Sequence, residues 1–177
     1  MVPTTTADHA SRHLPIGTKG MLVSIGGHEF EGDSPRLSMN DIRIFNINDG
    51  KWYVQTAVGD IPTSRMFFCG VMSAAPDNSS FNIYISGGLT SDQGLDDVYI
   101  LSIPSFRWVR AYSGSGPPRQ GHSCEIVQGK QMAVIGGFNA TSLPSQACGL
   151  EMGGDLRFFD MSASPDHHPL HCIAFWR

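Results

Sequence analysis

Pairs of adjacent glycines constrain the fold of this chain more than any other feature. Each pair closes a short, β-rich apolar run, at Gly26-Gly27, Gly87-Gly88 and Gly136-Gly137. Glycine adopts left-handed backbone conformations at little cost, so such a pair marks the end of a strand. The second glycines of the three pairs stand 61 and 49 residues apart. The sequence therefore predicts a structural unit that recurs about every 50 residues.

A second landmark, an aspartate followed by an apolar strand, recurs in step with the glycine pairs. It begins at Asp41, Asp97 and Asp155, which are separated by 56 and 58 residues. Trp52 follows Asp41 by 11 residues, and Trp108 follows Asp97 by the same distance. The same order of landmarks is thus kept in two copies and in most of a third.

The middle copy shows what one unit contains. Arg65 and Arg119, each just beyond a proline and 54 residues apart, are expected to open a further strand type. Four strands are predicted in this copy, over residues 65–73, 81–88, 97–103 and 107–112. Short connections between successive strands predict an antiparallel meander, so the fold class is all-β.

This order of landmarks resembles the kelch repeat, one four-stranded blade of a β-propeller, and is most similar to the galactose-oxidase-like kelch propellers common in fungi. An unrelated meander sandwich with ordinary glycine turns is the alternative. The resemblance implies a partial propeller over residues 20–177, with blade one at 20–61, blade two at 62–116 and blade three at 117–177. Residues 1–19 are expected to be a poorly ordered lead-in.

Two departures from the repeat suggest an incomplete ring. Blade one has no recognisable first strand, and Trp176 follows Asp155 by 21 residues instead of 11, which alters the end of blade three. Because propellers typically close with four to eight blades, three blades leave two faces uncovered. We expect a fragment or shortened product of a larger propeller, with self-association through the open faces; several chains completing one ring is the alternative.

Composition narrows the partners and the compartment. Charged residues make up 16% of the chain, the formal net charge is −4, and basic residues form no run, so no nucleic-acid partner is expected. The chain also lacks an apolar run of membrane-spanning length and a signal-peptide core. As written, it is expected to be cytoplasmic. The sequons at Asn78 and Asn139 would instead be glycosylated in a secreted or ectodomain context, if the chain belongs to a longer protein.

The four cysteines do not form a dense disulfide framework. Cys69 and Cys124 lie in predicted strands and are expected to be buried thiols. Cys148 and Cys172 lie in predicted irregular stretches of blade three. In an oxidising compartment, a disulfide between them could cross-link the long insertion at residues 138–154.

No set of residues with catalytic spacing is found. The resemblance implies a search for a copper site, but no Tyr-Cys-His set can be assigned. Asp166-His167-His168 with His171 and Cys172 is dense in ligands yet matches no standard zinc pattern. We therefore assign no catalytic, metal or cofactor-binding residue and expect no cofactor. His122, in the opening motif of blade three, is expected to make a structural hydrogen bond between blades.

Two functions stay open. The first is a non-catalytic interaction module that binds a protein or a glycan through its blade loops. The second is an ancillary enzyme or isomerase-like factor of small-molecule metabolism. In that case His28, Glu29, Asp92 and Asn139, all in loops beyond a glycine pair, would line one pocket.

Overall fold

The computed structural model describes residues 6–7, 9–29, 37–139, 156–162 and 171–172, and every regular element in them is a β-strand. The all-β prediction is confirmed. The strands are β1 Thr6–Ala7, β2 Ala10–Leu14, β3 Met21–Ile25, β4 His28–Glu29, β5 Asp41–Asn46, β6 Lys51–Thr56, β7 Val58–Gly59, β8 Cys69–Ala74, β9 Phe81–Leu89, β10 Gly94–Ile103, β11 Arg107–Tyr112, β12 Ser123–Val127, β13 Gln131–Ile135, β14 Leu156–Asp160 and β15 His171–Cys172.

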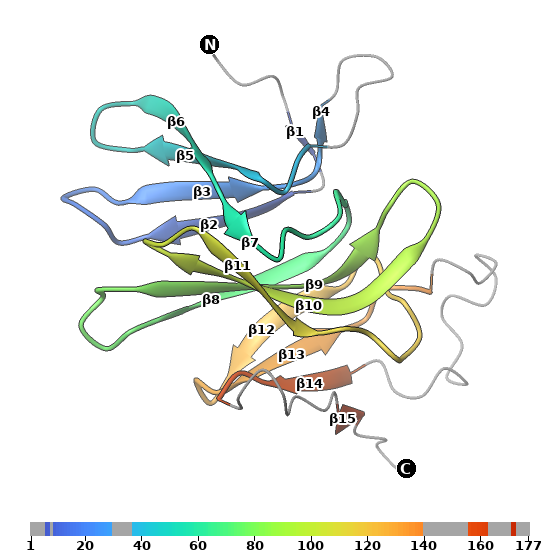
Figure 1. Ribbon diagram of the computed structural model, residues 1–177. Coiled ribbons are helices and arrows are strands. Elements are labelled where there is room, and N and C mark those ends of the chain that lie inside the picture. Colours follow the sequence, from blue (N-terminus) through green and yellow to red (C-terminus); the bar gives the residue numbers. More distant parts are fainter. Residues whose placement is uncertain (1–5, 8, 30–36, 140–155, 163–170, 173–177) are drawn as a thin grey trace.

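Three antiparallel sheets follow one another along the chain and correspond to three blades (Figure 1). Their strand orders are β2-β3-β5-β6 for blade one, β8-β9-β10-β11 for blade two and β12-β13-β14-β15 for blade three. The short strand β7, which leads from blade one to blade two, adds in parallel to the outer edge at β11, and β1 pairs with β4. The sheets lie face against face and do not close into a ring (Figure 1).

Blade two lies between the other two blades and buries both of its faces. In β9, Ile83 and Ile85 point into the core shared with blade one, whereas Tyr84 points into the core shared with blade three. Successive side chains of a strand alternate between faces. A strand covered on both sides is apolar at most positions, which explains the apolar residues of the predicted strand at 81–88.

The innermost strands of the blades bring the sheets together. β8 contacts β2 of blade one on one side and β12 of blade three on the other. Gly70 in β8 has no side chain, and a Cβ built there would stand 3.6 Å from the Cβ of Ala10. A methyl group at this position would thus be in ordinary van der Waals contact with blade one.

One expectation about blade one is wrong. Residues 10–14 lie within the supposed lead-in, yet they form β2, the first strand of the blade, which pairs with β3 from Ala10↔Ile25 to Leu14↔Met21. The segment ASRHL lacks β-branched residues, so local propensity gave no signal. It is a strand because β3 offers it a hydrogen-bonding edge and because Ala10 and Leu14 are buried in the core.

Two further boundaries differ from the prediction. Blade two begins its first strand at Cys69, not at Arg65, because the chain from Arg65 to Phe68 is not part of a continuous strand. Cys172, expected in an irregular stretch, lies in β15 and pairs with Arg157 of β14. No helix long and apolar enough to cross a membrane is found in the described segments.

Candidate functional site at the loop end of the blades

The first two glycine pairs form the joints between consecutive blades. The backbone N–H of Gly27 donates to the carbonyl of Arg65 at 3.2 Å, and that of Gly88 donates to the carbonyl of Arg119 at 2.8 Å. Each pair therefore ties the second strand of one blade to the start of the next blade. The two joints are equivalent.

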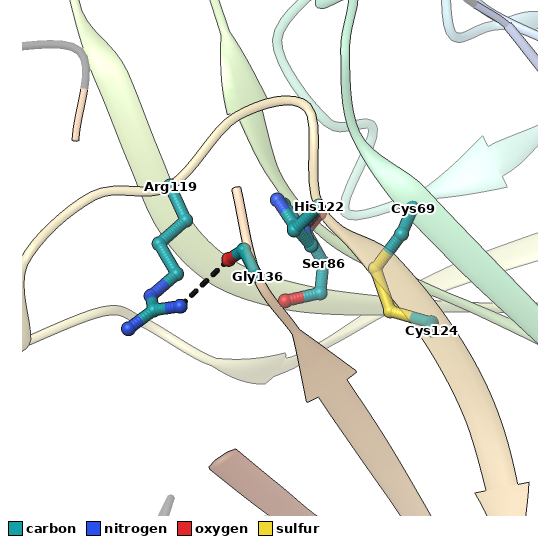
Figure 2. The surroundings of a disulfide bond; sticks show 6 residues. All are labelled: Cys69, Ser86, Arg119, His122, Cys124 and Gly136. Carbon is teal, nitrogen blue, oxygen red and sulfur yellow. Dashed lines mark hydrogen bonds between the residues drawn. A yellow bond between two sulfur atoms is a disulfide. The ribbon is translucent and has the colours of Figure 1, made fainter. Parts of the chain in front are cut away.

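The arginine side chains hold the same end of their own blades. Arg65 donates to the carbonyl of Gly87 at 3.0 Å and to both carboxylate oxygens of Asp97. Arg119 donates to the carbonyl of Gly136 at 2.7 Å (Figure 2). Both arginines are buried. A buried guanidinium that is used up by internal acceptors fixes the start of a blade and leaves little donor capacity for a ligand.

Gly88 shows why these positions require glycine. Its φ angle is +99°, a left-handed conformation that a side chain makes costly. A Cβ built on it would stand 2.7 Å from the carbonyl oxygen of Met66 and 2.9 Å from the Cβ of Phe68. The start of blade two thus packs directly on the Gly88 backbone.

His122 crosses from blade three to blade two. Its Nε2 lies 3.0 Å from the carbonyl oxygen of Ser86, and since a carbonyl can only accept, Nε2 carries the hydrogen. Burial lowers the pKa of His122 to about 4, so the ring is neutral at pH 7. This contact is the interblade hydrogen bond expected from the motif. In the joint between blades one and two, Phe68 holds the corresponding position and lies against Gly26.

The two inner-strand cysteines are buried, as predicted, but they are not free thiols. Cys69 of β8 and Cys124 of β12 form a disulfide, with their Cα atoms 5.5 Å apart (Figure 2). The separation of 55 residues is one more than the 54 between Arg65 and Arg119. One extra residue reverses the face to which a strand side chain points, so Cys124 faces back toward Cys69. The alternative disulfide between Cys148 and Cys172 is not tested, because Cys148 lies outside the described residues.

The most exposed aromatic side chains of this end were not anticipated from the sequence. Phe67 has a φ angle of +57° and is 37% exposed, and Phe138, just beyond Gly137, is 44% exposed. Both flank Gly121, whose N–H donates to the carbonyl of Phe67 at 2.8 Å and whose built Cβ would lie 3.4 Å from the Phe138 ring. We call Phe67 and Phe138 the aromatic pair.

Comparison with known proteins agrees with this architecture. A family model described as the KLHDC2/KLHL20/DRC7 Kelch-repeats domain matches residues 9–168. The chain belongs to the kelch-repeat family. A kelch repeat-containing protein of Arthroderma benhamiae is 33% identical over 156 residues, which are 83% of this chain and 23% of that protein.

Two further relatives are longer proteins that match this chain over part of their length. The host cell factor of Drosophila melanogaster is 32% identical over 70% of this chain and 9% of its own length. The acyl-CoA-binding domain-containing protein 5 of Arabidopsis thaliana is 28% identical over 88% of this chain and 24% of its own length. The chain thus spans about a quarter or less of these curated relatives.

Within this kelch domain, the two repeat tryptophans hold equivalent strand positions but differ in burial. Trp52 in β6 pairs with Phe45, and Trp108 in β11 pairs with Leu101. Trp108 is fully buried and its Nε1 donates to the carbonyl of Met39 in blade one at 2.9 Å, whereas Trp52 is 38% exposed. Trp108 packs on the preceding blade, blade one, whereas the described residues contain no blade before blade one that could cover Trp52.

The four residues proposed for a pocket are spread over three kelch blades. His28 and Glu29 form β4, Asn139 follows β13, and Asp92 accepts a hydrogen bond from Thr90 Oγ1 at 2.9 Å within its own loop. In the described part of the chain, these contacts do not join the four residues into one acid–base set.

The two predicted glycosylation sites differ in exposure. Asn78 is exposed in the turn between β8 and β9, whereas Asn139 is half-buried and the rest of its sequon lies outside the described residues. Asp155, Trp176 and the cluster from Asp166 to His168 also lie outside them.

Proposed function

We propose that this kelch domain is a non-catalytic interaction module that binds a protein partner at the loop end of blades two and three. Kelch-repeat domains are typically protein-interaction modules. We infer the location of the binding site from the aromatic pair, because exposed aromatic side chains on a rigid support are characteristic of the energetic centres of protein interfaces.

The backbone conformation of Phe67 is the main support for this proposal. It occupies the repeat position of Gly121, which has a φ angle of +63°, and it adopts the same left-handed conformation with φ +57°. A bulky residue in this conformation costs on the order of 1–3 kcal/mol. Such strain is commonly found where a side chain serves a function, and here it holds a ring toward solvent.

The support beneath the aromatic pair is rigid. Phe138 exchanges two backbone hydrogen bonds with Gln120, at 3.0 and 3.1 Å, and Phe67 receives the N–H of Gly121. Next to them, the arginine and glycine contacts described above lock blades two and three together. A preorganised surface loses little conformational entropy when it binds, which favours a protein or peptide ligand.

The binding site can be tested with a displayed peptide library selected against the immobilised domain. Peptides that bind the wild type are expected to lose at least about tenfold in affinity for a Phe67→Gly/Phe138→Ser variant. Tyr53→Ala is the matched control, because Tyr53 is 48% exposed on blade one, away from the aromatic pair, and should leave binding unchanged.

A glycan array screened with the same variants distinguishes the other ligand class. Specific glycan binding that depends on Phe67 and Phe138 would replace the protein partner by a carbohydrate at the same surface. Peptide and glycan binding that both ignore the aromatic pair would show that the site lies elsewhere.

We also propose that another kelch blade covers the outer face of blade one in a larger ring. The register of β3, β5 and β6 places Leu22, Phe45 and Trp52 in one row across that face, and Val54 lies beside them. Leu22, Trp52 and Val54 are 37%, 38% and 64% exposed. The opposite face, with Val23 and Ile42, packs on blade two, so this row is the natural contact for a further blade.

A further inference from the structure

Cys69, Cys124 and His122 gather three metal-binding side chains at the contact between β8 and β12 (Figure 2). One ligand atom from each lies within 4.8 Å of the others, and all three residues are at least nine-tenths buried. The interblade hydrogen bond uses Nε2 of His122 and the disulfide uses both sulfurs, but neither role uses Nδ1 of the buried imidazole.

The imidazole of His122 has one nitrogen to spare. Its Nε2 hydrogen is committed to the carbonyl of Ser86, so the lone pair is on Nδ1. This atom is buried and has no hydrogen-bond partner. A backbone carbonyl that fixes the tautomer of a histidine in this way is the usual support of a metal-binding imidazole.

We propose that, when the Cys69–Cys124 disulfide is reduced, the two thiolates and His122 Nδ1 bind a zinc ion between blades two and three. Zinc takes thiolate and imidazole ligands at about 2.3 and 2.0–2.1 Å in a tetrahedral arrangement. Two sulfurs bound in this way lie roughly 3.8 Å apart. One potential ligand atom of each residue lies within 4.8 Å of the others, so the separations that zinc requires are close to those already present.

The two states of the site exclude each other. Reduction by two equivalents of a small thiol breaks the Cys69–Cys124 bond and yields two protein thiols and one oxidised thiol disulfide. Zinc then binds both cysteines as thiolates, with release of two protons. Three protein ligands leave the fourth position of the metal to water or an external ligand. The joint between blades two and three is thus cross-linked by a disulfide under oxidising conditions and by a metal under reducing conditions.

Cobalt(II) serves as a spectroscopic probe for the zinc site. The full chain with Cys148→Ser and Cys172→Ser is used as background, so that only Cys69 and Cys124 can supply thiolate. After reduction, a titration with cobalt is expected to show thiolate-to-metal charge-transfer absorption that saturates at one equivalent and disappears when zinc is added. The oxidised protein should show none.

His122→Gln tests the third ligand. The glutamine amide can still donate to Ser86 from about the position of Nε2, but it offers no equivalent of Nδ1. Cobalt and zinc affinity should fall at least about tenfold, because loss of a residue that only supports a metal ligand already lowers metal affinity about 10- to 100-fold. Cys69→Ser and Cys124→Ser should each abolish the two-thiolate spectrum. Circular dichroism melts of each variant show whether it remains folded.

A measurement on the unmodified protein does not depend on any variant. Zinc should protect Cys69 and Cys124 of the reduced chain from alkylation, as mapped by mass spectrometry of peptides. Absence of the charge-transfer band in the reduced background protein would overturn the proposal. Equal protection of all four cysteines, or unchanged affinity in folded His122→Gln, would do so as well.

Discussion

Arg65 and Asp97 form a buried ion pair that ties the start of blade two to its third strand. Arg65 is 1% exposed, donates to both carboxylate oxygens of Asp97 and lies over the ring of Tyr99, 5.4 Å from its centroid. Removing one partner of a buried pair leaves an uncompensated charge, which typically costs about 3–5 kcal/mol.

Asp97→Asn is therefore expected to lower the free energy of unfolding by about 3 kcal/mol or more. Asp41→Asn is the control, because Asp41 holds the same repeat position in blade one but is exposed, and it should change stability by less than about 0.5 kcal/mol. Urea denaturation followed by fluorescence measures both. Equal effects would show that Arg65 does not need this carboxylate.

Gly88→Val should destabilise the domain by well over 1 kcal/mol, because strain at φ +99° is joined by contact with Met66 and Phe68. Gly50→Val isolates the conformational part, since Gly50 has φ +69° but open space around its built Cβ. A Gly88→Val midpoint no lower than that of Gly50→Val would refute the close packing at the joint.

Trp108 and Trp52 should differ in quenching and in their contribution to stability. In a Trp176→Phe background, acrylamide should quench Trp52 fluorescence strongly and Trp108 fluorescence weakly, as measured in the two single-tryptophan variants. Trp108→Ala should cost about 3–5 kcal/mol, the range for a fully buried tryptophan, and Trp52→Ala clearly less. Similar shielding of both would mean that another surface covers blade one.

Acid should weaken the fold through His122. The pKa of the ring is about 4 in the folded protein, because of burial, and about 6.5 when unfolded. As pH falls from 6.5 to 4, the unfolded chain binds a proton that the folded chain excludes, so stability decreases, by on the order of 3 kcal/mol. Urea titrations at several pH values in chelator should show this slope in the oxidised protein and not in His122→Gln.

The isolated chain should self-associate through the outer face of blade one. Sedimentation velocity is expected to give a concentration-dependent size, because Leu22, Trp52 and Val54 are exposed together. Trp52→Ser/Val54→Ser should reduce the association. Tyr53→Ser, on the opposite face of the same strand, should not. A monomer at all concentrations, with a cooperative melt, would contradict this prediction.

Much of the fold could be read from residues that act on their own stretch of backbone. The glycine pairs are needed wherever a strand ends in a left-handed conformation, and the alternation around Ile83 and Tyr84 follows from burial of both strand faces. These requirements are local and recur along the chain, so their spacing predicted a repeat of about 50 residues, which resembles the kelch repeat.

The candidate site could be predicted only in part, because it depends on contacts between blades. Phe67 stands where the next repeat has Gly121, but nothing local says that the ring is exposed rather than packed. The 55-residue spacing of Cys69 and Cys124 likewise gains meaning only once β8 and β12 are known to face each other.

By itself, the sequence determined the strand class, the repeat and the positions of the glycine joints, because these depend on backbone preferences and on the period of apolar residues. Only the tertiary structure decided that residues 10–14 are a strand, that Cys69 meets Cys124 and that Trp108 is buried while Trp52 is not. Each of these depends on which surface lies opposite. A neighbouring blade supplies hydrogen-bonding edges and apolar cover that no residue can specify from its own segment of chain.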